Sequence, residues 1–365
     1  MYSGKKIRNQ SDNFFTKGDP VEYRARFQPV ASLFAKRHYD QCEPNVQENV
    51  ERFSKFLSSY AQHQKPVNLA MGYRSLFLKI INDFIFSSIP ETMRSLANQD
   101  FDDPLCLATF AAINWTEWFS TNFPRLNMLA LQLPRRLVSL VTTGYDPTFQ
   151  VYDIVRELVQ HEKHSKTAKN TNCLMQRFIN AHLESKSQNT VPLSEVVLED
   201  ETILTMYGGI VDLANIVPFG TFMVSEDSRL QQRLYEELKS VWPDRSASVP
   251  SYEVLRHLPL LAVVSAPSYF VHMDPVAYPD PKRFDPERWI KNDHPGPIVA
   301  FSKGRRMCPA VHLANIEMFA TFATVFRRYI VVSYETSIED FEWSQYFSIH
   351  FTGRQLRALL KERDL

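Results

Sequence analysis

Apolar residues recur every three or four positions along most of the chain, which is the spacing of one face of an α-helix. Residues 42–60 carry their apolar side chains on one face, and residues 75–87 are apolar nearly all round, as in a buried helix. Further helical periods cover 105–120, 148–162, 172–184, 200–215, 228–241 and 311–328. The pattern predicts a mainly helical protein.

Strand signals are confined to the end of the chain. Residues 330–334 are predicted to form a strand, and a second, weaker signal lies at 346–351. Many of the 22 prolines fall between 267 and 309, which predicts an irregular coil, because proline fixes φ and donates no backbone hydrogen bond. Polar breaks between the helices are short, so we expect residues 1–365 to form one domain, mainly α with a reduced β element.

Composition narrows the possible functions. The chain has 365 residues, and 41 Lys and Arg balance 41 Asp and Glu, so no overall field attracts nucleic acid or an anionic membrane. The four cysteines are far apart and form no Cys-x-x-Cys pair, which argues against a disulfide framework or a structural zinc site. No run of 18 apolar residues and no signal pattern is present, so we expect a soluble protein of a reducing compartment.

One segment carries recognisable chemistry, Phe301-Ser-Lys-Gly304-Arg-Arg306-Met-Cys308, and a predicted helix follows it at about 311. The unpaired N–H groups and the dipole at the start of a helix favour a negative sulfur at Cys308. Gly304 allows a turn that a side chain would block, Arg306 offers a forked charged donor, and Phe301 would shield the sulfur from water. The alternative is an inert buried cysteine in a turn.

This segment resembles the heme-ligand signature Phe-x-x-Gly-x-Arg-x-Cys of the fungal-type cytochrome P450 monooxygenases. The resemblance extends over almost the whole chain and is most specific at 268–328, where residues 284–289 read Phe-Asp-Pro-Glu-Arg-Trp. It implies a P450-like helical domain that binds heme through Cys308, with Arg306 on a heme propionate. It also implies a small apolar secondary metabolite as substrate and an electron-donating flavoprotein reductase as partner.

The chain departs from the family pattern in the middle. Leu258-Pro259-Leu260-Leu261 runs within a few residues into Ala266-Pro267, so the family's Glu-x-x-Arg helix and the strands after it are expected to be missing near 264–268. Arg288 would then lose its partners and turn to solvent, or the heme loop would loosen. The pairs Glu91-x-x-Arg94 and Glu253-x-x-Arg256 are interpreted as ordinary helix surface pairs. The family's N-terminal anchor is also expected to be absent.

Further departures concern the central helix. Asp212 stands where the family has a threonine that relays protons, and it is either a partial relay or merely a polar helix residue. Pro218 is expected to kink a helix that is long and straight in the family. The motif's last glycine is replaced by Ala310, a change that is tolerable if the backbone there is ordinary and costly if φ is positive.

At the heme edge, the family's helix carries an aromatic residue or a histidine four residues before an arginine that binds a heme propionate. In this chain Tyr23 stands at the first of these positions and Phe27 at the second. That arginine is therefore lost, and Arg24 and Arg26 either substitute for it or are solvated charges.

Two outcomes stay open for the whole protein. One is an active heme-thiolate monooxygenase, located in the cytoplasm or peripherally at the endoplasmic reticulum, with a docking patch for the reductase formed by Lys303, Arg305, Arg327 and Arg328. The other is a catalytically inactive derivative, either a decayed or mis-spliced copy or a helical scaffold that binds an apolar ligand.

Overall fold

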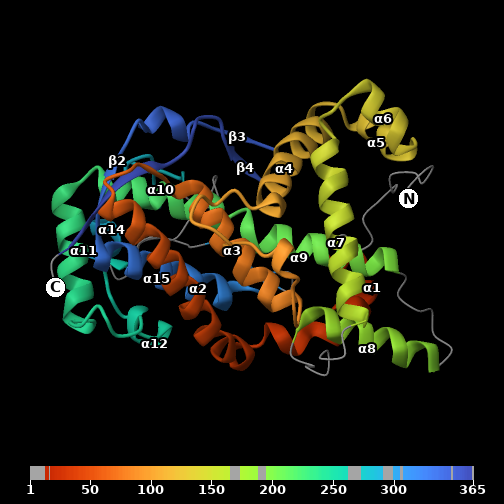
Figure 1. Cartoon of the computed structure of the whole chain (residues 1–365), viewed down its shortest axis with the longest axis horizontal. Helices are drawn as coiled ribbons and strands as arrows, with labels where there is room; N and C mark the ends of the chain where they lie inside the picture. Colours follow the sequence, from red (N-terminus) through yellow and green to blue (C-terminus); the bar gives the residue numbers. More distant parts are fainter. Residues whose placement is uncertain are drawn as a thin grey trace. The chain divides into compact units, whose positions relative to one another are not determined.

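The computed structural model describes residues 13–15, 17–164, 173–187, 195–261, 273–290, 299–304, 307–346 and 348–363. The chain divides into two compact units, each built from segments that are distant in sequence (Figure 1). The first unit takes the described residues of Met1–His38, Arg74–Asp212 and Trp343–Phe351. The second unit takes those of Tyr39–Tyr73, Leu213–Glu342 and Thr352–Leu365.

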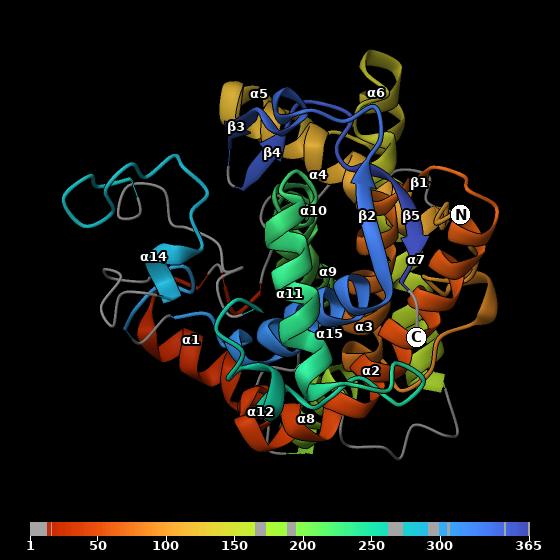
Figure 2. The same cartoon turned by 90° about the vertical axis from the view of Figure 1, so that its left-hand side faces the viewer.

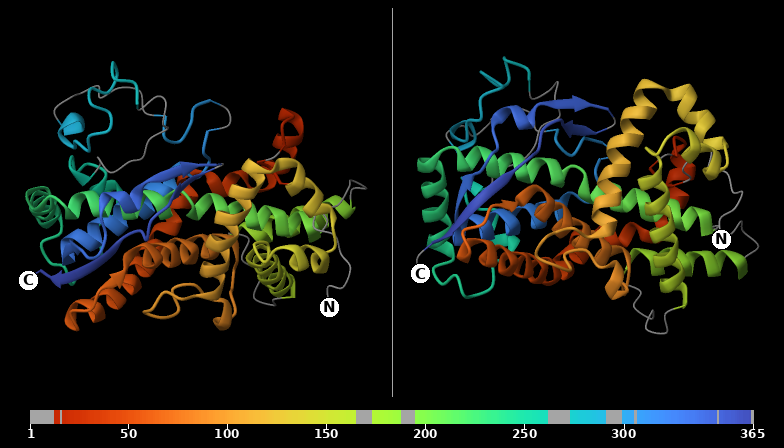
Figure 3. Two further views of the ribbon diagram at one scale, coloured as in Figure 1. Left: turned by 90° about the horizontal axis from the view of Figure 1, so that it is seen from above. Right: turned by 45° about the horizontal axis from the view of Figure 1, so that its top comes forward.

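The first unit is dominated by a packed pair of long helices, α4 (Pro104–Asn122) and α7 (Asp146–His164) (Figure 3). Buried apolar side chains of α7 recur at helical spacing, so one face of the helix is apolar and packs against another element. A two-stranded antiparallel ribbon, β3 (Trp343–Gln345) with β4 (Ile349–Phe351), belongs to the same unit. The other helices are α1 (Pro20–Phe27), α5 (Pro124–Gln132), α6 (Arg135–Val141), α8 (Leu174–Ser187), α9 (Glu195–Ile210), the end of α3 (Leu69–Ile85), and the 3₁₀ segments η1 (Gln28–Phe34) and η2 (Glu91–Met93).

The second unit packs helices around α15 (Val311–Arg328), whose side chains are largely buried. Both α11 (Ser228–Val241) and the short α12 (Tyr252–Leu255) contact α15, and Figure 2 shows them around it. A three-stranded antiparallel sheet has the order β1-β5-β2, and Val331 pairs with Leu360 in it. The remaining elements are α2 (Lys36–Gln62) from Tyr39 on, α10 (Leu213–Ser225), α14 (Glu287–Ile290), η4 (Ile338–Phe341), β1 (Val67–Asn68), β2 (Tyr329–Ser333) and β5 (Arg357–Glu362).

The predicted mainly α class with few strands is confirmed. The helix expected at 311–328 has those bounds, and strands lie near both predicted positions. The central helix differs from the prediction, because the chain breaks it at residues 211–212 into α9 and α10. Pro218 lies inside α10, so the expected disruption occurs before the proline and not at it. Strand β5 and helices α5 and α6 were not predicted.

Candidate functional site

The Cys308 loop is closed by its own main chain. The N–H of Cys308 donates to the carbonyl of Phe301 at 3.0 Å, and the N–H of Met307 donates to the carbonyl of Gly304 at 3.2 Å. Gly304 has φ of +85°, in the left-handed region that favours glycine, as the motif predicted. Ser302 also has positive φ, at 62°. These turns bring the half-buried thiol of Cys308 back beside Phe301.

Helix α15 begins directly after this loop. Its N-cap is Ala310, with φ of −96°, so the backbone that carries a glycine in the family pattern is ordinary here and alanine costs little. Cys308 lies three residues before Val311, the first residue of the helix. The free N–H groups and the dipole at a helix N-terminus stabilise a negative charge nearby. The loop therefore suits a thiolate at position 308.

The other three cysteines suit that role poorly. Burial raises the pKa of Cys42 to about 11, that of Cys106 to about 12 and that of Cys173 to about 12. Each of these thiols is therefore protonated at neutral pH, and a protonated thiol is a poor metal ligand. None of the four cysteines is in a disulfide. Cys308 is the best candidate ligand among them.

The side chain of Arg288 makes solvent-exposed hydrogen bonds within its own turn, and the expected loosening of the heme loop stays a prediction. Its guanidinium donates to the carbonyl of Pro279 at 3.0 Å, and to those of Asp280 and Arg283 at 3.1 Å each. The forked guanidinium offers five donors in a plane, so one side chain satisfies three carbonyls of a tight turn. The two Glu-x-x-Arg pairs are exposed i,i+3 surface pairs, with N–O distances of 3.5 Å (Glu91–Arg94) and 3.3 Å (Glu253–Arg256), as predicted.

The predicted basic patch is only partly formed. Arg327 is fully buried, and its guanidinium donates to the carbonyls of Trp242 and Pro243. Arg328 holds the Glu51 carboxylate with two N–H groups, at 3.1 and 2.7 Å. Neither arginine is available to a partner, and the prediction for both is wrong. Lys303 is exposed, and Arg305 lies outside the described residues.

Asp212 is the second of the two residues that separate α9 from α10, and it belongs to the first unit. The residue is partly open to solvent, but desolvation of its carboxyl by the surrounding protein, and secondly the carboxylate of Glu117, raise its pKa above the usual value. A raised pKa brings a carboxyl closer to the range in which it exchanges protons at neutral pH. This property suits the predicted relay but does not by itself assign it.

A polar cluster next to Asp212 was missed by the sequence interpretation. The buried carboxylate of Glu117, on α4, accepts from the Ser348 N–H at 2.8 Å and from the Ser348 hydroxyl, and it lies 2.6 Å from Nε2 of His350. The other ring nitrogen of His350 lies 2.9 Å from Oδ1 of Asn114. The cluster joins the β3–β4 ribbon to α4. No local sequence signal could have found it, because its members are more than 200 residues apart.

The two candidate propionate arginines are on α1. Arg24 is exposed, whereas Arg26 Nη1 lies 3.8 Å from the fully buried carboxylate of Glu201. The rings of Tyr23 and Phe27 stack with centroids 5.5 Å apart. The structure thus places Arg24 and Arg26 in the first unit and Phe301, Gly304 and Cys308 in the second. Arg306 lies outside the described residues, and its role stays a prediction.

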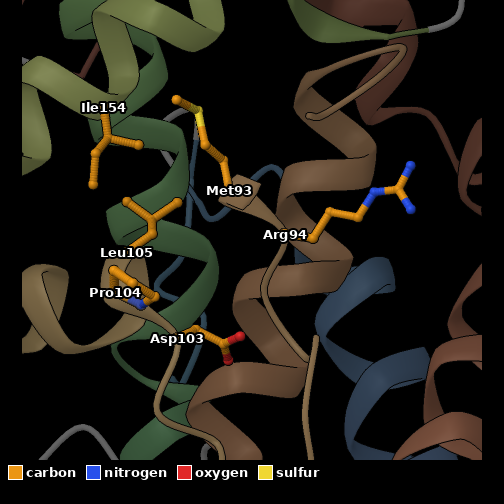
Figure 4. A pocket seen from close by; sticks show the side chains of 6 residues that line it. All are labelled: Met93, Arg94, Asp103, Pro104, Leu105 and Ile154. Carbon is orange, nitrogen blue, oxygen red and sulfur yellow. The ribbon is translucent and has the colours of Figure 1, made fainter. Parts of the chain in front are cut away.

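A cavity of about 260 Å³ in the first unit is drawn in Figure 4. Met93, Leu105 and Ile154 give it an apolar lining, and the carboxylate of Asp103 at its edge is held by the Ser75 hydroxyl and by the main chain after Ser95. Arg94 points away from the cavity. No cysteine lines it, so it does not offer the ligand that the heme loop offers.

The described residues of the second unit fit a heme bound through a cysteine. A half-buried thiol stands at the start of a long helix, on a loop whose glycine has positive φ. In P450 enzymes a thiolate is the protein's ligand to the heme iron.

Within the described residues, one helical stretch, Glu195–Ser225, is long and apolar enough to cross a membrane, and half of it is buried as in a core helix.

Comparison with known proteins agrees with this site. The sequence model of the cytochrome P450 family matches residues 2–264 and 262–356. The cytochrome P450 monooxygenase ppzG of Metarhizium majus is 37% identical over 301 residues, covering 66% of this chain and 97% of that protein. The tryptophan 6-hydroxylase fscE of Fusarium equiseti is 25% identical over 372 residues, covering 89% and 71%.

The fold agrees as well. A crystal structure of a cytochrome P450 matches with a TM-score of 0.76, covering 98% of this chain and 86% of that one at 14% identity. The P450-like fold is thereby confirmed. The family uses heme as its cofactor. The chain belongs to the cytochrome P450 family.

Proposed function

We propose that this protein is a heme-thiolate monooxygenase for a small apolar secondary metabolite, with Cys308 as the axial ligand, and that its turnover is impaired. The observation that carries the assignment is the closed loop that holds a half-buried thiol in front of α15. When bound, heme would supply oxygen activation, and a thiolate ligand favours cleavage of the O–O bond. The substrate class follows from the family and stays a proposal.

The protein's own residues take limited roles in this proposal. Cys308 holds the anionic sulfur, Gly304 provides the turn, and Phe301 limits access of water to the sulfur. Arg306 is the proposed donor to a heme propionate, and Arg24 is a further candidate because its guanidinium is exposed. Arg26 is a weaker candidate, since its ion pair with Glu201 already engages it.

Impairment is supported by two kinds of observation. The family model matches in two pieces that meet at residues 262–264, close to the gap inferred at 264–268. The alignment with ppzG runs over 301 positions but takes in only 66% of this 365-residue chain, so the relative carries residues that this chain lacks. Asp212 offers a carboxyl where the family has an alcohol, which changes the acidity of the proposed proton donor.

A catalytically inactive P450-derived scaffold is the second candidate. It is favoured by the same missing block, because deleting a helix and strands removes burial worth many kcal/mol, against a net stability of about 5–15 kcal/mol. Against it, the N–H groups of Cys308 and Met307 close the heme loop onto the carbonyls of Phe301 and Gly304. The reductase as electron donor and a location at the endoplasmic reticulum stay family-based proposals.

A carbon monoxide difference spectrum of the reduced, heme-supplied protein tests the assignment directly. The expected result is a thiolate-type Soret band that disappears in Cys308→Ser while the protein stays folded by circular dichroism. Cys106→Ser is the matched control and should keep the band, because Cys106 is a buried, protonated thiol. Absence of the band in the wild-type protein would reject the monooxygenase proposal and favour the scaffold.

A further inference from the structure

The first turn of α15 is held from outside by two neighbouring residues of α2, all within the second unit. Tyr39 is fully buried, and its hydroxyl donates to the carbonyl of Pro309 at 3.4 Å. Asp40 Oδ1 lies 3.0 Å from Nε2 of His312. These contacts fall one and four residues after Cys308, on the segment that connects the cysteine to the helix.

Aromatic packing supports the same turn. The ring of His312 lies between two tyrosines, with centroids 6.2 Å from that of Tyr39 and 5.1 Å from that of Tyr252, the latter edge-on. Tyr252 is itself tied to α2, because its N–H donates to the carboxylate of Glu43. Helices α2, α12 and α15 thus meet at His312. The imidazole cannot rotate without breaking the Asp40 contact or its packing.

The hydroxyl of Tyr39 remains a donor at physiological pH. Burial raises the pKa of Tyr39 above its usual value. A protonated phenol donates to the Pro309 carbonyl and so orients the peptide group that follows the cysteine. Because Pro309 has a fixed φ and no N–H, its carbonyl is the main-chain group through which this position can be held.

We propose that Tyr39 and Asp40 are positioning residues for the axial ligand: by holding the Pro309 carbonyl and the His312 ring, they set the direction of the Cys308 side chain. The inference rests on the proposed heme-thiolate function. The Tyr39–Asp40 clamp acts on the side of the loop that follows the cysteine.

Two readouts test the clamp. The first is the ratio of thiolate-type to non-thiolate Soret bands in the reduced carbon monoxide complex. Tyr39→Phe removes only a hydroxyl, and we expect the ratio to fall about fivefold, the order that one hydrogen bond provides. Asp40→Ala should have a similar effect, whereas Asp40→Asn, which keeps an acceptor for His312, should retain most of the wild-type ratio.

The second readout needs no heme. It is the rate at which iodoacetamide alkylates Cys308 in the heme-free protein, followed by mass spectrometry. A loosened loop should react severalfold faster in Tyr39→Phe and in Asp40→Ala. The matched control is Tyr73→Phe, because Tyr73 is equally buried in the same unit and donates or accepts at Thr221 Oγ1, 3.0 Å away. Tyr73→Phe should leave both readouts at wild-type values.

The outcomes separate the two proposals. A wild-type thiolate band that persists unchanged in Tyr39→Phe and Asp40→Ala overturns the clamp alone. An equal loss in Tyr73→Phe also overturns it, because the effect would then be general destabilisation. If the wild-type protein shows no thiolate band, the heme function fails, and unchanged alkylation rates in the variants would reject the clamp as well. Asp40 is partly exposed, so its variants decide the matter even if Tyr39→Phe does not fold.

Discussion

Glu317, on α15, tests whether a buried carboxyl in the core of the second unit is neutral in the folded protein. Its side chain is 2% exposed, and Oε2 has no hydrogen-bond partner among the residues that the structure describes. Burial raises the pKa of this carboxyl well above its usual value of 4.5. In the folded protein the group is therefore neutral at a pH where the unfolded chain has already ionised it.

The sign of the pH dependence follows from this difference. Below the unfolded pKa both states hold the proton, and burial of the carboxyl carries no ionisation penalty. As the pH rises through that pKa, only the unfolded chain releases its proton, so folding stability falls by about 1.4 kcal/mol per pH unit. The fall continues until the pH reaches the folded pKa. Glu317→Gln cannot ionise, so its advantage over the wild type should grow as the pH rises from 5 to 7.

Urea unfolding of the heme-free proteins at pH 5, 6 and 7, followed by circular dichroism, measures this difference. The matched control is Glu48→Gln, the same substitution at an exposed position of α2 in the same unit, which should follow the wild-type curve. If the Glu317→Gln curve runs parallel to that of the wild type over this range, the carboxyl is ionised in the folded state. The description of Glu317 as a buried neutral acid is then incorrect.

Two further pairs of substitutions test the packing of the first unit. Gly209→Ala should destabilise the protein by about 1–3 kcal/mol, because the added Cβ would lie 2.5 Å from Cγ1 of Ile81. Gly208→Ala should be neutral or stabilising, because no atom lies within 4 Å of its added carbon. Equal shifts of the two variants in thermal melting would contradict this. Glu117→Ala should cost about 2–3 kcal/mol, since it leaves half-buried donors without their acceptor, and Ser348→Ala about 1 kcal/mol. Urea titrations that show no such order would count against the cluster.

Periodicity alone predicted the long helices because each of them buries one continuous face. Residues 311–328 show this best, since an uninterrupted period runs from the motif to the strand after it. Strand β5 was missed because Ala358, Leu360 and their neighbours are good helix formers, and only pairing with β2 makes them a strand. The break at 211–212 was missed because the residues on both sides are apolar and read as one helix.

In the candidate site too, local features could be predicted from the sequence and contacts between distant segments could not. Gly304 and Cys308 were predictable because a local turn needs particular residues at fixed spacing, and the structure gives Gly304 the positive φ that this turn requires. Contacts between distant segments were not predictable. Asp40 meets His312 across more than 250 residues, and Glu117 meets Ser348 across more than 200, so no local pattern connects them. The carbonyl acceptors of Arg288 were not predicted either, because they come from its own turn and no family comparison reveals them.

In the proposed function, ligand binding and turnover depend on different parts of this chain. The loop around Cys308 is closed by its own main chain and followed by a long helix, and the Tyr39 hydroxyl donates to the carbonyl of Pro309 just after the cysteine. The central helix is broken at residues 211–212, and the proposed proton relay Asp212 has a raised pKa. Heme ligation therefore tests only the Cys308 loop. A protein that binds heme through Cys308 but fails to oxidise substrate would place the defect at proton delivery, and Asp212→Thr is the substitution that should then recover activity.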